Sequence, residues 1–136
     1  MSTASRIDAN AHGAIHAGIL HLTARLGIDT AYDIVTDPAA GLPHIDTAIR
    51  TADEHTLVAI LQAGQHLDRA PFAAGLAAAA VLTIRGQADD AVARLESVVA
   101  TSSPNQRKAA SITFQALAKT RPELSTTVDR LRALLT

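Results

Sequence analysis

The chain of 136 residues contains no cysteine and no tryptophan, and its aromatic residues are one tyrosine and two phenylalanines. The lack of cysteine excludes a disulfide framework, a thiolate nucleophile and a cysteine zinc site. Long apolar runs are also missing, because the longest, over residues 70–84, is shorter than the ~20 residues that a membrane span needs. The first residues lack the basic and apolar stretches of a secretory signal. We therefore expect a cytoplasmic protein.

Alanine is the residue that the sequence has in excess. It accounts for 29 positions, and hydrophobic residues make up 48% of the chain against 18% charged. This composition excludes a disordered chain, and the length suits one domain. The net charge of −1 is too small to attract nucleic acid or a membrane surface to the chain as a whole. The charge is nevertheless divided, since residues 1–104 carry 6 basic and 11 acidic side chains, whereas residues 105–136 carry 6 basic and 2 acidic ones.

Apolar residues recur every three or four positions along most of the chain, which is the spacing of an amphipathic helix. The predicted helices cover residues 7–26, 29–36, 44–50, 52–67, 71–85, 88–100, 105–119 and 122–135. No segment alternates with the period of two that is typical of a strand. We therefore predict an all-α fold, a compact bundle of about six to eight short helices with helical-hairpin packing in its C-terminal half.

The predicted single domain, residues 1–136, has three parts. N-terminal helices occupy residues 1–36, a loop occupies residues 37–43, and helical hairpins occupy residues 44–136. The loop is predicted because two prolines and a glycine fall within it, and both residue types interrupt helices.

Helix ends are marked by two kinds of signal. A serine or threonine followed three residues later by an acid or amide is typical of an N-terminal cap. The four segments with this pattern are Ser5–Asp8, Thr51–Glu54, Ser103–Gln106 and Thr120–Glu123. Gly27 and Gly86 follow apolar-periodic runs and can adopt the left-handed conformation that ends a helix.

Residues 71–85 are apolar on every side, which predicts a central helix or one covered by a second subunit. Gly75 and Ala79 lie four apart within it, so another helix can approach closely there. The excess of apolar helix surface, together with the divided charge, predicts a homodimer in which the acidic N-terminal region faces the basic C-terminal hairpin. We expect Leu131 and Leu135 to be exposed on the last helix and to support this association.

Residues 72–104 carry a recognisable hairpin pattern. It consists of a small residue, Ala79, in the first helix, Gly86 at the turn, Leu95 and Val98 on the inner face of the second helix, and Pro104 after it. This pattern resembles a tetratricopeptide-like helical hairpin repeat. The resemblance implies αα-hairpin packing and raises peptide binding as a possible role, but it assigns no binding residue.

Candidate metal ligands lie in the first predicted helix. His12 and His16 are four apart, and Asp8 precedes them by one turn, a spacing that can hold a metal ion. A zinc site also needs a third ligand and usually a general base, and no HExxH motif is present, so we expect these side chains to lie in solvent or beside the apolar stripe. Asp29, Asp33 and Asp37 form a second acidic series, for which a solvated face is the preferred interpretation over a cation site.

Catalytic patterns are absent from the sequence. It has no nucleophile elbow and no glycine-rich phosphate loop, and the acidic pairs Asp53–Glu54 and Asp89–Asp90 stand where they stabilise helix starts. We therefore expect neither an enzyme nor a cofactor.

A cluster of basic residues in the last 32 positions is the strongest candidate interaction feature. Its members are Arg107, Lys108, Lys119, Arg121, Arg130 and Arg132. Phe114 is the one aromatic among them, and no recognition-helix pattern is present, so an acidic protein partner or a solvated face is preferred over nucleic acid.

The sequence thus favours a non-enzymatic protein-interaction or regulatory module. One alternative is a small-ligand carrier or helper enzyme with an apolar pocket between helices, since small alanine side chains leave space there. Another is nucleic-acid binding through the basic C-terminal hairpin.

Overall fold

The computed structural model describes residues 16–36, 38–63 and 71–136, and every regular element in these ranges is helical. Helical residues 16–26 come first. They are followed by α2 (Ile28–Thr36), α3 (Pro38–Arg50), α4 (Glu54–Ala63), α5 (Pro71–Ile84), α6 (Ala88–Val99), α7 (Pro104–Thr120), the 3-10 turn η2 (Pro122–Leu124) and α8 (Ser125–Leu134). The all-α prediction is confirmed. None of the helices in the described ranges has the length and apolarity to cross a membrane.

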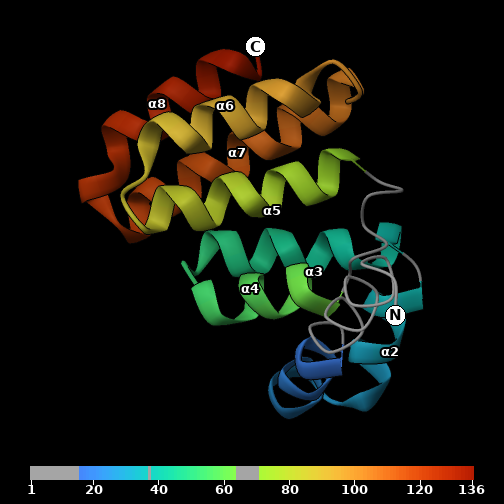
Figure 1. Cartoon of the computed structure of the whole chain (residues 1–136). Coiled ribbons are helices and arrows are strands. Elements are labelled where there is room, and N and C mark those ends of the chain that lie inside the picture. The colour runs from blue at the N-terminus through green and yellow to red at the C-terminus, as the bar shows by residue number, and fades with distance from the viewer. Residues whose placement is uncertain (1–15, 37, 64–70) are drawn as a thin grey trace, which may run out of the picture.

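Helix α5 is the centre of the bundle. Figure 1 shows it crossing the middle of the molecule, with α6, α7 and α8 on one side and α3 and α4 on the other. Its alanines Ala77, Ala79 and Ala80 are fully buried. A Cβ atom at Gly75 would lie only 2.7 Å from Cγ1 of Val98, so α6 approaches α5 as closely as a glycine allows. The predicted central helix and its close contact are both confirmed.

Helices α5 and α6 form the hairpin that the sequence predicts. Gly86 turns the chain with a φ of +78°, and the amide of Gln87 donates to the carbonyl of Leu82 at 2.8 Å. On α6, Ala91 and Leu95 are buried. The spacing of small and apolar residues therefore gives hairpin packing in this pair of helices.

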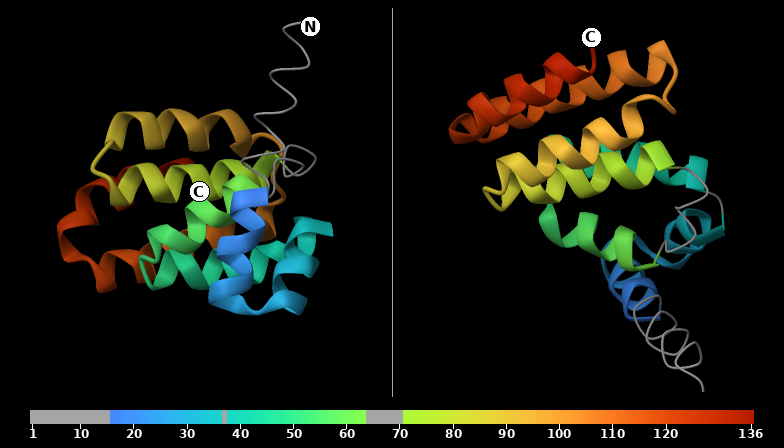
Figure 2. Two further views of the ribbon diagram at one scale, coloured as in Figure 1. Left: turned by 60° about the horizontal axis from the view of Figure 1, so that its bottom comes forward. Right: turned by 45° about the horizontal axis from the view of Figure 1, so that its top comes forward.

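Helices α7 and α8 close one end of the bundle, where α8 packs on α6 and α7 (Figures 1 and 2). The predicted cap of α7 is confirmed. Gln106 donates its amide proton to the Ser103 hydroxyl at 3.1 Å, and the Gln106 side chain accepts from the Ser103 amide at 2.9 Å. The expected exposure of Leu131 and Leu135 is wrong. Their side chains are only 0% and 4% exposed, so both are buried in the bundle.

The loop predicted at residues 37–43 is wrong, because α3 begins at Pro38 and continues unbroken to Arg50. Pro38 stands at the first helical position, where its missing N–H costs no hydrogen bond. Pro43 removes one bond within the helix. Ile45, Ala48 and Ile49 then bury one face of α3 in the core, and this burial outweighs the lost bond.

Two predicted caps are also wrong. Thr51 does not begin α4, which starts at Glu54, and its hydroxyl donates back to the carbonyl of Thr47 at 2.9 Å. Thr120 does not begin the last helix, because its hydroxyl donates across to the carbonyl of Arg50 at 2.7 Å. The predicted cap at Ser5 lies outside the described residues.

Candidate functional site

A mostly apolar hollow lies between α3, the start of α5 and α7. We call it the α3/α7 cleft, and its volume is about 500 Å³. Its walls are mostly apolar. They consist of Leu42, Pro43, Asp46, Arg50, Phe72, Leu76, Gln106, Ala109, Ala110, Ile112 and Thr113.

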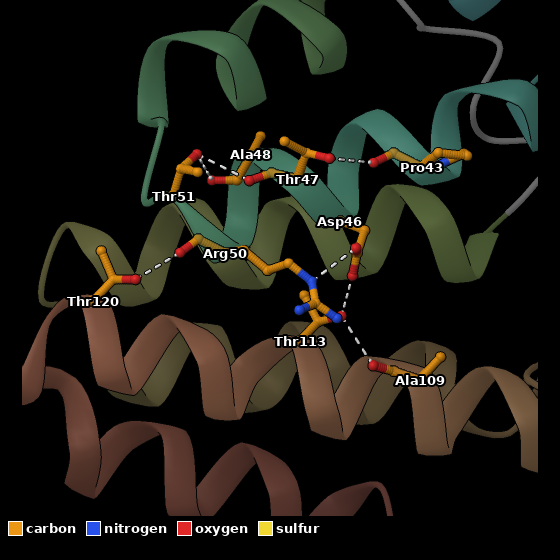
Figure 3. Close-up of polar contacts among 9 residues, drawn as sticks. All are labelled: Pro43, Asp46, Thr47, Ala48, Arg50, Thr51, Ala109, Thr113 and Thr120. Carbon is orange, nitrogen blue, oxygen red and sulfur yellow. Dashed lines mark hydrogen bonds and ion pairs between the residues drawn. The ribbon is translucent and has the colours of Figure 1, made fainter.

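One wall of the α3/α7 cleft carries a polar network, which Figure 3 shows. Asp46 on α3 accepts a hydrogen bond from the hydroxyl of Thr113 on α7, and its other oxygen lies 2.9 Å from Nε of Arg50. The Thr113 hydroxyl also lies 2.9 Å from the carbonyl of Ala109, its alternative acceptor. A few turns away, Thr120 donates to the carbonyl of Arg50 and ties the two helices together again. The charges of the cleft are therefore paired with one another.

This pairing determines the chemistry that the α3/α7 cleft offers. Asp46 and Arg50 are the two ionisable side chains among its described lining residues, and each neutralises the other. The remaining lining contributes hydrocarbon surface and one amide, that of Gln106. Such a surface suits the apolar side chains of a ligand better than a charged substrate.

A second hollow lies on the other side of α7, against α8. We call it the α7/α8 cleft, and its volume is about 420 Å³. Arg107, Lys108 and Arg132 line it together with apolar atoms from Pro104, Ile112 and Leu135. Arg107 donates to the carbonyl of Ser102 at 2.9 Å, and Arg132 donates to the Ser111 hydroxyl at 3.1 Å. Neither these two arginines nor Lys108 forms an ion pair with a carboxylate of the described residues.

The other three members of the predicted basic cluster lie elsewhere. Arg130 reaches Asp89 at the start of α6 at 3.0 Å, Arg121 pairs with Glu123 at 2.7 Å, and Lys119 is exposed near the far end of α7. The structure therefore brings together half of the cluster and separates the rest.

Two carboxylates outside the clefts have shifted titration. Burial raises the pKa of Asp53, but hydrogen bonds from the Thr56 hydroxyl and amide, and the hydrogen bond and charge of Arg25, lower that pKa below its ordinary value. The Thr56 hydroxyl donates to Asp53 at 2.6 Å and accepts from Arg25 at 2.7 Å, so this node joins helical residues 16–26 to the start of α4. The hydrogen bond from Arg121 lowers the pKa of Glu123.

The metal candidates are only partly described. Asp8 and His12 lie outside the described residues, and His16 is exposed. Within residues 16–36, 38–63 and 71–136, no three histidine or acidic side chains come close enough together to hold a metal ion. Asp29 and Asp33 are exposed on α2, as a solvated face requires, while Asp37 lies outside the described ranges.

Sequence reasoning missed the α3/α7 cleft, although a signal for it was present. Ala109 and Ile112 belong to the three- and four-residue apolar spacing over residues 105–119, and this spacing alone would place both on the buried face. The structure instead buries Ala110, Thr113 and Phe114, one position further along, and leaves Ile112 49% exposed between the two clefts. A helix with apolar residues on more than one face was the available signal.

No family model, curated protein or solved structure matches this chain. The resemblance to a tetratricopeptide-like hairpin therefore stays a prediction, and the function has to be inferred from the two clefts.

Proposed function

We propose that the protein is a non-enzymatic interaction module whose α3/α7 cleft receives the apolar face of a helix from a partner protein. The single observation that carries this proposal is the internal pairing of Asp46 with Arg50 and Thr113 beside an otherwise apolar lining. A partner helix can bury its apolar side chains there without stranding a charge.

The shape of the cleft supports a helix as the occupant. Its lining residues on α7 run from Gln106 to Thr113, which makes a wall of about two helical turns, roughly 12 Å long. Ile112 is half-exposed on this wall, so it can contact an incoming helix. These are the features of helix-in-groove recognition, in which apolar anchors spaced by one turn enter a groove between helices.

An apolar small molecule is the second candidate occupant. The cleft volume of about 500 Å³ falls within the range of roughly 300–1,000 Å³ that is typical of small-ligand sites. Nucleic-acid binding has less support, because three of the six basic residues of the C-terminal hairpin lie away from the α7/α8 cleft.

Site-specific photocrosslinking tests the proposal. A benzophenone side chain is introduced at Ala109, which lines the cleft, and in a matched control at Ala133, which is exposed on α8. In extracts of the source cells we expect a defined protein to crosslink at position 109 and not at position 133. The substitution Ile112→Asp places a charge on the cleft wall and should abolish that crosslink, whereas Leu20→Asp, at an exposed leucine on residues 16–26, should leave it intact.

Mass spectrometry of the intact protein distinguishes the two occupants. A bound small molecule that Ile112→Asp releases and Leu20→Asp retains would establish the ligand carrier instead. Equal crosslinking at positions 109 and 133 would overturn both assignments of this cleft.

A further inference from the structure

Helix α2 presents an outward face that combines apolar and acidic side chains. Ile28 is 71% and Tyr32 68% exposed, and they lie one turn apart. Asp29 and Asp33 follow them directly and are exposed as well. Ala31 and Ile34 bury the opposite face, so these four side chains project from the bundle together. Large apolar side chains with this exposure are typical of an interface.

The α7/α8 cleft has the complementary chemistry. Its apolar floor carries Ile112, and its rim carries Arg107, Lys108 and Arg132 without carboxylate partners among the described residues. Elsewhere in the described chain five arginines form ion pairs with carboxylates, as Arg130 does with Asp89. An acidic ligand with apolar side chains would thus satisfy both the floor and the rim.

The two surfaces of one copy cannot meet. Figure 1 and the right-hand view of Figure 2 place α2 and α8 at opposite ends of the molecule, with α5 between them. Any contact between the outward face of α2 and the α7/α8 cleft therefore joins two copies.

We propose that α2 of one copy docks in the α7/α8 cleft of a second copy. Ile28 and Tyr32 bury apolar surface against Ile112, and Asp29 and Asp33 face Lys108 and Arg132. Two copies related by a twofold axis form this contact twice, because each carries both surfaces. The inference goes beyond the function proposed for the α3/α7 cleft. The two clefts share Ile112, but Lys108 and Asp33, which carry the test below, do not line the α3/α7 cleft.

A charge exchange between two variants tests the contact. Lys108→Glu makes the cleft rim acidic, and Asp33→Lys makes the α2 face basic. Each variant alone places like charges in both contacts of a symmetric dimer, and we expect the dissociation constant to rise about tenfold or more. In an equal mixture, the unaltered α2 of the Lys108→Glu chain meets the unaltered cleft of the Asp33→Lys chain, and the two altered surfaces meet each other. Association should therefore return.

The matched controls reverse one charge at positions outside the contact. Lys119→Glu alters the other end of α7, and Glu96→Lys alters an exposed position on α6. Both should associate like the unaltered chain. Circular dichroism and thermal unfolding establish that each variant folds, and the recovery in the mixture separates lost contact from lost structure.

Two measurements report the result. Sedimentation gives the mass, which should approach twice 14.1 kDa for a dimer. Tyrosine fluorescence reports whether α2 lies in the contact, because Tyr32 on α2 is the single tyrosine and the chain has no tryptophan. Its quenching by acrylamide should fall as the protein concentration rises.

Three outcomes would overturn the proposal. They are a monomer at protein concentrations up to about 100 μM, an association that both substitutions leave unchanged, and a mixture that associates as weakly as each variant alone. Species larger than a dimer that both substitutions suppress would support the same contact, repeated head to tail. A monomeric result would leave the α3/α7 cleft and its crosslinking test unaffected.

Discussion

The two clefts beside α7 have similar volumes and share Ile112, yet they treat charge in opposite ways. In the α3/α7 cleft, Asp46 neutralises Arg50 and accepts from Thr113. In the α7/α8 cleft, Lys108 and Arg132 have no carboxylate partner among the described residues. One helix therefore offers a neutral apolar surface on one side and a basic apolar surface on the other.

The difference indicates what each side can bind. An apolar partner enters a neutral cleft with little desolvation cost, because the ion pair stays formed at the rim. A basic cleft adds attraction over distance and sets the orientation of an acidic partner, while the apolar floor supplies most of the affinity. Both clefts have apolar lining residues, so apolar surface does not distinguish them. The presence of the Asp46 carboxylate in the α3/α7 cleft does.

Truncating the buried core side chain of α7, the helix that borders both clefts, has the largest expected effect. Phe114 on α7 is fully buried, and Phe114→Ala should lower the free energy of unfolding by about 3–5 kcal/mol. Urea unfolding measures the change, with Ile112→Ala on the same helix as the control. Ile112 is half-exposed, so its truncation should cost less than about 1 kcal/mol. Equal losses for the two variants would contradict the placement of Phe114 in the core.

Removing the carboxylate of Asp46 should make the α3/α7 cleft basic, as the α7/α8 cleft is. Asp46→Ala leaves Arg50 without its partner, and Thr113 retains the carbonyl of Ala109 as an acceptor. We expect a loss of about 1 kcal/mol in the free energy of unfolding, because one partly buried hydrogen bond and one exposed ion pair disappear.

The matched variant in the basic cleft is Lys108→Ala. Lys108 is exposed and has no ion pair within the described residues, so its removal should change the free energy of unfolding by less than about 0.5 kcal/mol. Denaturant unfolding of both variants in the same buffer gives the comparison. A larger loss for Lys108→Ala than for Asp46→Ala would reverse the distinction between the clefts.

The sequence predicts the helices of the C-terminal half well, because their ends depend on local chemistry. Ser103 with Gln106 begins α7, and Gly86 turns the chain before α6, as short-range patterns indicate. It fails at α3, where prolines at positions 38 and 43 suggest a loop. Each proline removes a single N–H, and the tertiary burial of Ile45 and Ile49 decides the outcome.

The candidate sites were predictable only in composition. The sequence predicts the basic residues of the C-terminal hairpin as one group, but the structure divides them into a cluster of three and three separated cations, and this division depends on how α8 packs on α6 and α7. The pairing of Asp46 with Thr113 joins residues 67 positions apart. No periodicity in α3 or α7 alone specifies such a contact, so the pairing that makes this cleft neutral could not be read from the sequence.

The last prediction concerns the pH dependence of stability at another place where a carboxylate is paired internally, the node of Asp53, Arg25 and Thr56. Since the folded pKa of Asp53 is lowered from 3.8, its contribution to stability is fully present above about pH 4 and is lost as the pH falls through the folded value. Asp53→Asn should therefore weaken the acid dependence of unfolding by no more than about 1 kcal/mol, which urea unfolding above and below that pH measures. Glu96→Gln, at an exposed carboxylate on α6 without an ion pair in the described chain, is the control and should leave the acid dependence unchanged. An Asp53→Asn chain that loses stability below pH 4 as steeply as the unaltered chain would show that the node does not hold this carboxylate in its charged form.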